Sequence, residues 1–371
     1  MEKLGKYIQE YTVKNKCAEN IPVYSVTNTQ GFCKDYFGKE VASKDKTTYK
    51  IVPKGYFAYN PSRINVGSVD WQRNEERVIV SPLYNVFSVS EQLNQQYLYY
   101  YLKSDIVRQF IKVIARGTVR DNLKLSMLCE FPIYVPSVLE QENIVVKLDG
   151  LQKVIKLRKQ QLHKLDELIQ ARFVEMFGEP STNPRGWTET TVGDECFYIK
   201  DGPHKSLPDI GKENGGHPFI SVRNIVNGYI DFSTARYISD EDFAEAIKKC
   251  HPEKGDILYS KGGTTGIAKF IDIDEEFANW VHVAVLKFDK SKLNGIFFEN
   301  MLNGAYCYEQ SQRLTKGIAN RDLVLSAMAQ IKMYRPPIEL QNQFADFVNQ
   351  VHKSKLVIKN LLQIYKHQIQ M

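Results

Sequence analysis

The segment from residue 137 to residue 178 constrains the fold of this chain most strongly, because its apolar residues recur every seven positions. This period is typical of a long helix that packs lengthwise against another helix. Gly178 can take a left-handed conformation at the helix end, and Pro180 cannot continue the helix. About 40 helical residues would span about 60 Å. The apolar seam of this predicted helix consists of Leu148, Leu151, Ile155, Leu162, Leu165 and Ile169.

A second segment with the same spacing occupies residues 337–371. Its seam consists of Phe344, Val348, Val351, Ile358, Leu362 and Tyr365. The two segments are offset by 200 residues (337 minus 137), and the same offset relates Tyr134 to Tyr334, Pro136 to Pro336 and Gln141 to Gln341. A repeat of this length, present twice, indicates an internal duplication, because a solenoid needs shorter and more numerous repeats.

The chain is therefore predicted to contain two copies of one plan, a globular module followed by a long helix. We place the modules at residues 1–136 and 179–336, and the helices at residues 137–178 and 337–371. Each module alternates β-rich runs with helical segments. The predicted fold class is therefore α+β (mixed), with two globular α/β modules joined by two long antiparallel helices in a pseudo-two-fold internal duplication.

Composition narrows the class of protein further. The 371 residues are 43% hydrophobic, which is enough for a core in each module. No apolar run reaches the roughly 18–20 residues of a membrane span, and the N-terminus lacks a signal-peptide core. The six cysteines are scattered without a C-x-x-C pair, as in proteins with reduced thiols. We expect a cytoplasmic protein, and its net charge of +6 is compatible with binding a polyanion.

No catalytic constellation can be recognised. The run Asn60-Pro61-Ser62-Arg63 is only half of the Asn-Pro-Pro-aromatic loop of an amine methyltransferase. Residues 261–266 are rich in glycine but lack the Lys-Ser/Thr that a P-loop requires. The acidic residues form no convincing magnesium cluster of a nuclease, and the seven histidines lack metal-ligand spacing. We therefore expect neither a catalytic residue nor a metal site in this chain.

Polar loops that follow predicted strands and helices recur at matching places in the two copies. Arg and Lys can neutralise phosphates, and Arg, Asn and Gln can read base edges, so these loops are candidates for contact with DNA. The candidates in the first module are Asn28, Gln30, Arg63, Asn65, Arg116 and Arg120. The candidates in the second module are His204, Lys205, Arg223, Asn224, Lys261, Thr264, Thr265, Lys316, Asn320 and Arg321.

The order of modules and helices, together with several local phrases, resembles the specificity (S) subunits of Type I restriction–modification systems, the HsdS family. The phrases are residues 54–61 (Lys-Gly-Tyr-Phe-Ala-Tyr-Asn-Pro), residues 201–205 (Asp-Gly-Pro-His-Lys), the helix starts at 136–141 and 336–341, and the linker at 176–187. The resemblance covers the whole chain. The first module lacks an obvious counterpart of the Asp-Gly-Pro-His phrase.

The resemblance implies a DNA-binding, non-catalytic specificity subunit of a bacterium or archaeon that acts at the nucleoid. Each module would be a target recognition domain for one half of a bipartite double-stranded DNA sequence. The helices would form a coiled-coil spacer and dock two modification subunits, which carry S-adenosylmethionine and methylate adenine N6. Restriction subunits with ATP and magnesium would complete the assembly. No cofactor would be bound by this chain itself.

Two other classes of function remain open at this stage. The chain could be a protein–protein scaffold with two duplicated binding modules and no role with DNA. It could also be a self-contained modification enzyme, although the missing cofactor and Asn-Pro-Pro-aromatic motifs argue against that. The sequence does not provide the DNA target or the length of its spacer.

Overall fold

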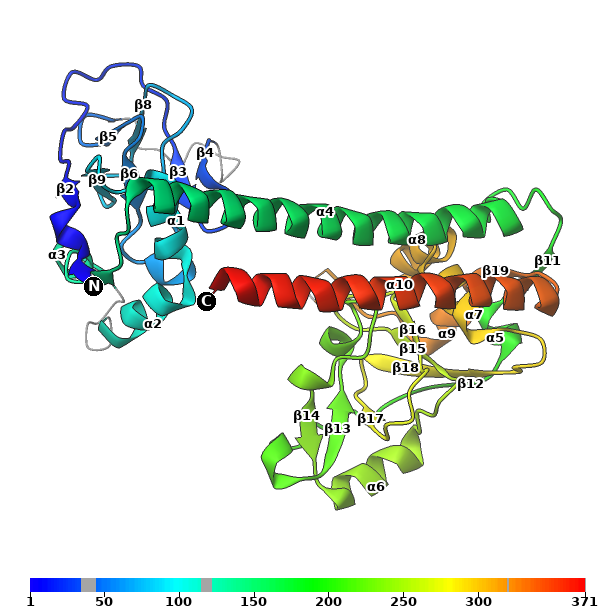
Figure 1. The fold of residues 1–371 in the computed structure, drawn as a ribbon. Coiled ribbons are helices and arrows are strands. Elements are labelled where there is room, and N and C mark those ends of the chain that lie inside the picture. The colour runs from blue at the N-terminus through cyan, green and yellow to red at the C-terminus, as the bar shows by residue number, and fades with distance from the viewer. Residues whose placement is uncertain (35–44, 115–121, 319, 371) are drawn as a thin grey trace. The chain divides into compact units, whose positions relative to one another are not determined.

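The computed structural model describes residues 1–34, 45–114, 122–318 and 320–370 (Figure 1). The chain divides into two compact units. Unit 1 contains Met1–Gln160 and Ile358–Met371, and unit 2 contains Gln161–Val357. Each unit consists of a module of helices and short strands together with parts of two long helices, α4 (Val138–Phe177) and α10 (Ile338–Gln370). The predicted mixed α+β fold with two domains is confirmed.

The module of unit 1 is built on a four-stranded antiparallel sheet. The strands of this sheet are, in spatial order, β2 (Ile8–Glu10), β9 (Asn85–Val89), β6 (Phe57–Tyr59) and β7 (Val69–Trp71). Three antiparallel pairs complete the strands: β1 (Glu2–Lys3) with β10 (Pro132–Ile133), β3 (Ser25–Thr27) with β4 (Gly31–Cys33), and β5 (Lys50–Pro53) with β8 (Arg77–Val80). The helices are α1 (Gln95–Lys103), α2 (Asp105–Ile114) and α3 (Leu125–Leu128).

The core of this module lies between the sheet and the helices. Phe57 and Phe87 stack on neighbouring strands with ring centroids 5.1 Å apart. They belong to one buried cluster with Leu98 of α1 and with Val107 and Ile111 of α2. The apolar residues of α2 fall on one face of the helix, so burying that face against the sheet drives its packing.

The module of unit 2 repeats this plan and adds to it. Its main sheet has the order β12 (Cys196–Asp201), β18 (Val283–Phe288), β15 (Ile257–Ser260) and β16 (Ala268–Phe270). A pair is formed by β11 (Thr188–Thr191) and β19 (Lys332–Arg335), and a second sheet by β14 (Arg236–Ile238), β13 (His217–Ile220) and β17 (Ala278–Asn279). The helices are α5 (Val192–Glu195), α6 (Asp240–Lys249), α7 (Gly295–Asn303), α8 (Ala305–Leu314) and α9 (Leu325–Met328).

The two modules match element by element. Helices α7 and α8 begin at residues 295 and 305, which is 200 residues after α1 at 95 and α2 at 105. The four-stranded sheets share one order. In both, the first strand of the sheet in the sequence lies beside the fourth, followed by the second and the third: β2-β9-β6-β7 in unit 1 and β12-β18-β15-β16 in unit 2. These correspondences support the predicted duplication. The second sheet of unit 2 has a partial counterpart in unit 1, where Val23 pairs in parallel with Ile79 of β8 as β13 pairs with β17. No described helix of unit 1 lies at the place of α6.

A buried glutamine fastens the start of each long helix to its module. In unit 1, Gln141 is fully buried and accepts a hydrogen bond from the N–H of Asn94 at 2.8 Å. Its amide donates to the carbonyl oxygens of Gln92 at 2.9 Å and Pro136 at 2.8 Å. Asn94 in turn caps α1, because its side chain accepts from two N–H groups of the first turn.

Gln341 repeats this arrangement in unit 2. It is fully buried, accepts from the N–H of Asn294 at 2.8 Å, and donates to Lys292 at 3.1 Å and Pro336 at 2.8 Å. Asn294 caps α7 as Asn94 caps α1. Each glutamine therefore uses its acceptor and both donors to fix a loop, a helix cap and the start of a long helix at one point.

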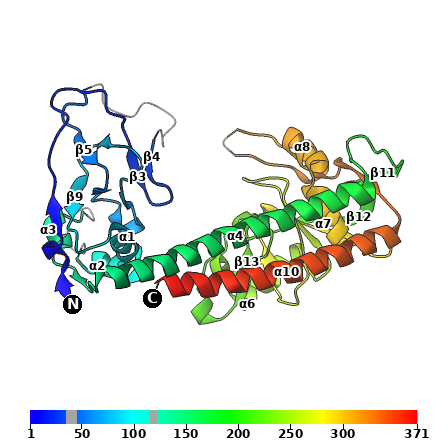
Figure 2. The ribbon, with the colours of Figure 1, turned by 45° about the horizontal axis from the view of Figure 1, so that its top comes forward.

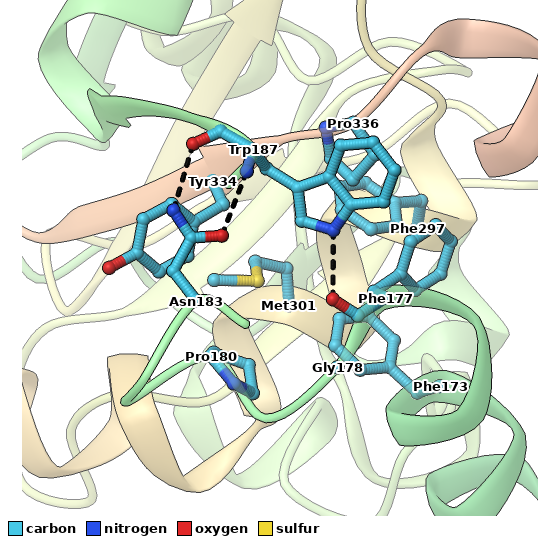
Figure 3. A pocket seen from close by; sticks show the side chains of 10 residues that line it. All are labelled: Phe173, Phe177, Gly178, Pro180, Asn183, Trp187, Phe297, Met301, Tyr334 and Pro336. Carbon is cyan, nitrogen blue, oxygen red and sulfur yellow. Dashed lines mark hydrogen bonds between the residues drawn. The ribbon is translucent and has the colours of Figure 1, made fainter. Parts of the chain in front are cut away.

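The end of α4 is held by aromatic residues of unit 2. Gly178 follows the helix with a φ of +81°, the left-handed conformation expected after a helix. The indole of Trp187 donates to the last helical carbonyl, that of Phe177, at 2.8 Å. Asn183 makes two hydrogen bonds with the backbone of Trp187, both at 2.9 Å, and fixes the turn between them. Figure 3 shows these residues around a small pocket with Met301 behind them.

Within unit 2 the two long helices run antiparallel and side by side (Figure 1, Figure 2). Near the end of α4, the rings of Phe177 and Phe344 lie 5.6 Å apart, and farther back Asp166 pairs with Lys355. Ile169, Phe173 and Phe177 of α4 enter one core cluster with Phe344, Val348 and Val351 of α10. The predicted seam did not include Phe173 or Phe177. They enter the core because a straight helix drifts from a strict seven-residue repeat, and because Phe297 of the module stacks on Phe173 at 5.6 Å.

Every residue of the two predicted seams is buried or half-buried. Ile155, Ile169, Phe344, Val348, Val351, Ile358 and Leu362 are buried, and Leu148, Leu151, Leu162, Leu165 and Tyr365 are half-buried. Other apolar residues of the same helices are exposed, including Leu157 at 53%, Leu168 at 46%, Leu356 at 60%, Val357 at 60% and Ile364 at 54%. The long helices thus carry apolar surface that their own module does not cover.

Candidate nucleic-acid interface

The tip of the hairpin formed by β3 and β4 carries two predicted DNA contacts of unit 1. Asn28 and Gln30 are both exposed at this tip. The hairpin rests on β7, where the N–H of Phe32 donates to the carboxylate of Asp70 at 3.1 Å. Gly31 has a φ of +64°, and a Cβ at this position would lie 1.8 Å from Asp70 Oδ2. Only glycine permits so close an approach, so the residue at position 31 sets where the tip lies.

A second polar loop of unit 1 follows β6 and lies beside the hairpin. Its predicted contacts are Arg63, which is exposed, and Asn65, which is half-buried. The ammonium of Lys103 donates to the carbonyls of Asn28, at 3.3 Å, and of Gly67, and so ties the hairpin to this loop. Burial lowers the pKa of Lys103. Two further predicted contacts lie outside the residues that the structure describes: Arg116 and Arg120.

Beside these loops is a cluster that the sequence analysis missed. Arg73 Nη1 lies 2.7 Å from Asp70 Oδ1. Its guanidinium also lies over two aromatic rings, 4.4 Å from the centroid of Trp71 and 5.2 Å from that of Tyr99. Cation–π contacts of this kind hold an arginine in a defined orientation. The run from Asp70 to Arg73 could have indicated the cluster, because an acid, an aromatic residue and an arginine directly follow the polar loop.

In unit 2, the predicted contact Lys261 is buried rather than presented to solvent. Its side chain is 8% exposed, and its ammonium lies 3.4 Å from Asp201 Oδ2 and 3.1 Å from Asp322 Oδ1. Two carboxylates therefore already balance its charge. We assign Lys261 to the support of the loops, because a phosphate would have to displace both acids to reach it.

Two more predicted contacts of unit 2 also support the loops. Thr265 is 1% exposed, and its hydroxyl lies 3.0 Å from that of Thr315. Asn224 is likewise 1% exposed, accepts from the N–H of Ser221 at 2.9 Å and donates to the carbonyl of Asp231 at 3.0 Å. Their hydrogen-bonding groups are engaged within the protein, so they shape the loops that carry the exposed residues.

The remaining predicted contacts of unit 2 are exposed. They are His204, Lys205, Arg223, Thr264, Lys316, Asn320 and Arg321. Arg223 donates to the carbonyl of Thr234 at 2.5 Å, and Arg321 donates to the side chain of Gln312, so both guanidinium groups are oriented. Neither Lys205 nor Lys316 forms an ion pair with any residue that the structure describes. These two ammonium groups are available to phosphates.

Three of the predicted loops of unit 2 converge, although they are far apart in the sequence. The N–H of Gly263 donates to the carbonyl of Arg321 at 3.0 Å, and the N–H of Leu323 donates to that of Lys261 at 2.7 Å. The ion pair between Lys261 and Asp201 adds the Asp-Gly-Pro-His-Lys loop at residues 201–205. The structure thus joins the loops that contain residues 201–205, 261–266, and 316–318 with 320–322.

The turn at Trp280 and His282 links these loops to the one that carries Arg223. The N–H of Trp280 donates to the carbonyl of Ile220 at 2.8 Å, and the N–H of Lys261 donates to that of His282 at 2.8 Å. Within the described residues, Trp280 Nε1 and His282 Nδ1 are buried without a hydrogen-bond partner. This turn was not predicted from the sequence. The only signal was an indole and an imidazole placed just before an apolar strand.

In the parts of the chain that the structure describes, no group of three or more His, Cys, Asp or Glu residues is arranged to hold a metal ion. None of the described helices is both long enough and apolar enough to cross a membrane.

Comparison with known proteins identifies a family. The family model for the Type I restriction modification DNA specificity domain matches residues 3–167 and again residues 184–364. The Type I restriction enzyme MjaIX specificity subunit of Methanocaldococcus jannaschii is 26% identical over 260 residues, which cover 66% of this chain and 59% of that protein. The match therefore spans less than two thirds of the length of this curated relative.

Two solved structures share the fold. One comes from work on complex assembly and conformational transition of the type I R-M system. It has a TM-score of 0.61 at 17% identity, and the match covers 99% of this chain and 94% of that one. The other is the S subunit of a Type I restriction–modification system from M. genitalium, with a TM-score of 0.53 at 14% identity and coverage of 100% and 94%. At these identities the likeness concerns the fold alone.

Proposed function

The chain belongs to the family of Type I restriction modification DNA specificity domains, whose model matches both of its halves, and from this we propose that it is the DNA-recognition subunit of such a system. In this proposal each module reads one half of a bipartite target in double-stranded DNA. The chain itself performs no catalysis. Methylation of adenine N6 belongs to modification subunits that bind S-adenosylmethionine, and DNA cleavage belongs to restriction subunits that use ATP and magnesium.

The observation that carries the proposal is that equivalent strands of the two modules deliver polar loops. The loop after β6 carries Arg63 and Asn65, and the loop after β15, the matching strand, carries Thr264. In each unit these loops are joined to others by hydrogen bonds, through Lys103 in unit 1 and through Lys261 in unit 2. Two related surfaces with similar chemistry suit a target that consists of two half-sites.

The exposed side chains fit the chemistry of DNA. Lys205 and Lys316 are suited to phosphates, because both are exposed and form no ion pair with a described residue. Arg223 is oriented by its bond to Thr234 and can bind guanine bidentately, while Asn28 can read adenine. Phosphate contacts position the protein on the duplex, and contacts with base edges provide the sequence specificity.

The long helices are proposed to set the spacer between the two half-sites and to bind the modification subunits. Burial of their seams leaves other apolar residues exposed, including Leu356 and Val357. Exposed apolar surface of this kind is typical of protein–protein interfaces. In this proposal each chain binds two modification subunits.

Exchange of a module tests the proposal. Residues 1–135 are replaced by the matching module of a relative, the variant is expressed with its modification subunits, and methylation is mapped by single-molecule sequencing of host DNA. One half of the methylated sequence should change and the other half should stay. If both halves changed, or if neither did, the modular assignment would be wrong.

Two controls accompany this experiment. The purified chain alone should transfer no methyl group to DNA, since the proposal places that chemistry in the modification subunits. Binding of the complex to DNA should weaken steeply with salt, because phosphate contacts release counterions. A complex that assembles normally but shows no affinity for DNA would favour the protein–protein scaffold instead.

A further inference from the structure

The loop between α8 and α9 carries an apolar side chain, Ile318, that no described residue covers. Ile318 has a relative exposure of 101%, the highest among the exposed large hydrophobic side chains of the described chain. Its neighbours in the loop are polar or basic: Lys316, Asn320 and Arg321 are all exposed. The loop follows α8 (Figure 2), and backbone hydrogen bonds join it to the loop at residues 261–266.

Hydrogen bonds make the base of this loop rigid. Lys316 and Asp322 exchange two backbone hydrogen bonds of 2.9 Å each. Gly317 has a φ of +85°, and a Cβ there would lie 2.2 Å from the carbonyl oxygen of Asn320. The N–H of Leu323 donates to the carbonyl of Lys261 at 2.7 Å, which fastens the loop to the sheet. Ile318 therefore projects from a fixed base.

The charges around the tip favour a polyanion. The carboxylate of Asp322, at the base, is paired with buried Lys261 at 3.1 Å. Asp201, which also contacts Lys261, is paired with Lys249 at 3.0 Å, so the two ammonium groups balance the two carboxylates. Arg321 is oriented by Gln312 and by Thr265, whose hydroxyl lies 3.4 Å from Nη2. Lys316 has no ion-pair partner in the described chain. An apolar tip between cationic side chains matches a stacked base step between two phosphate backbones.

We propose that Ile318 is a wedge that inserts between two base pairs of the half-site read by the second module. This inference rests on the proposed function, because it assumes that unit 2 binds DNA. The side chain would partly unstack one base step, and Lys316 and Arg321 would bind the flanking phosphates. Proteins that deform DNA commonly use isoleucine, leucine or phenylalanine in this way, and the unstacked step then contributes to specificity.

Position in the fold distinguishes Ile318 from other exposed apolar residues. Leu356 and Val357 lie on a long helix, where a flat apolar face suits another helix or a protein surface. Ile318 instead stands alone at the tip of a narrow loop, so it offers little area to a protein partner. Its shape suits insertion into DNA, because a single branched side chain on a rigid base can enter a gap between stacked bases.

The test uses the chain in complex with its modification subunits and a duplex that carries the methylated target. The exchange of modules identifies the half-site of unit 2. 2-Aminopurine is placed at successive base steps of each half-site, and its fluorescence reports unstacking. Three variants are compared with the wild type: Ile318→Ala, Lys316→Ala, and Leu83→Ala as a matched control, since Leu83 is an apolar residue of unit 1 that is 79% exposed.

Ile318→Ala should weaken binding about tenfold, as expected when one buried aliphatic side chain is lost, and should abolish the fluorescence increase in the second half-site only. Leu83→Ala should change neither quantity. Lys316→Ala should keep the fluorescence increase and should lower the slope of log K against log salt by about one.

Other outcomes would overturn the inference in separate ways. Wild-type affinity and unstacking in Ile318→Ala would exclude a wedge. Loss of binding to the modification subunits in Ile318→Ala, with DNA unstacking kept in the complex that remains, would make Ile318 a contact with a protein partner. A wild-type complex that binds no DNA would overturn the proposed function and the wedge together, whereas binding without any unstacked step would overturn the wedge alone.

Discussion

At the scale of single residues, the molecule depends on polar side chains that are completely buried and completely hydrogen-bonded. Gln141 and Gln341 are the clearest pair, since each makes three hydrogen bonds to equivalent partners in its own unit. The hydrogen bonds of such a buried amide contribute little net stability, because they replace hydrogen bonds to water in the unfolded chain. Removal of the amide is costly, because the partners lose their hydrogen bonds where water cannot replace them.

We predict that Gln341→Leu destabilises unit 2 by about 3 kcal/mol, because it leaves the N–H of Asn294 and two carbonyl groups buried without partners. The change in free energy of unfolding can be measured by urea denaturation. Gln343→Leu is the matched control, since Gln343 is exposed on the same helix, and it should cost less than about 0.5 kcal/mol. Equal effects of the two substitutions would contradict the structural role of Gln341.

A second buried polar pair makes stability depend on pH. Lys269 and Glu299 of unit 2 lie 3.0 Å apart, and their side chains are 9% and 15% exposed. Burial raises the pKa of Glu299 above its ordinary value of 4.5, and the nearby ammonium of Lys269 only partly opposes that rise. The pKa of Glu299 is therefore higher in the folded state than in the unfolded chain. Its contribution to the free energy of unfolding is fully present below pH 4.5 and is lost as the pH rises through the pKa of the folded state.

We predict that Lys269→Met costs about 3 kcal/mol at neutral pH, because it leaves a buried carboxylate without a partner. The loss should be smaller near pH 5, since Glu299 is then more easily protonated in the folded state. The double variant Lys269→Met with Glu299→Gln keeps an acceptor for the N–H of Phe270 and should come within about 1 kcal/mol of the wild type. Urea denaturation at both pH values would measure this, and a loss independent of pH would argue against the pair.

At the scale of elements, the long helices have two kinds of apolar surface. One kind forms the seam, in which Phe344 and Val351 are 0% and 6% exposed. The other kind is exposed, with Leu356 and Val357 at 60% each. The seam holds the helices and the module of unit 2 together, and the exposed residues are free to contact another protein. The two surfaces should therefore respond differently to substitution.

We predict that Leu356→Asp combined with Val357→Asp leaves the stability of the chain within about 0.5 kcal/mol of the wild type, because both side chains are already in water. Association with the modification subunits should weaken at least about tenfold, because charge would enter an apolar interface. Co-purification and calorimetry would show this. The contrasting control Val351→Asp places a charge in the seam and should unfold unit 2. Unchanged association in the double variant would mean that the partner binds elsewhere.

At the scale of the whole molecule, one architectural plan serves twice with different loops. The order of strands in the main sheet, the paired helices after it, and the glutamine at the start of the long helix are the same in both units. Within the described residues, α6 and strand β14 occur only in the module of unit 2. A shared scaffold with divergent loops is what two different half-sites would require, because each set of loops can change without altering the core.

The amino-acid sequence by itself determined the features that depend on local period and on repetition. The seven-residue spacing predicted helices at residues 137–178 and 337–371, and the structure has α4 at Val138–Phe177 and α10 at Ile338–Gln370. The offset of 200 residues predicted that the modules share a plan. Such patterns can be recognised without coordinates, because helical periodicity is a property of neighbouring positions and a duplication repeats the order of residues along the chain.

Only the tertiary structure decided which polar loop residues face solvent. Lys205 and Lys261 are both lysines in glycine-containing loops, yet Lys205 is exposed and Lys261 is buried. The partners of Lys261, Asp201 and Asp322, are 60 and 61 residues away from it in the sequence. Burial and charge pairing are set by such distant residues. The exposure of Ile318 on a rigid base depends in the same way on bonds that join separate loops, so it could not be predicted from the sequence.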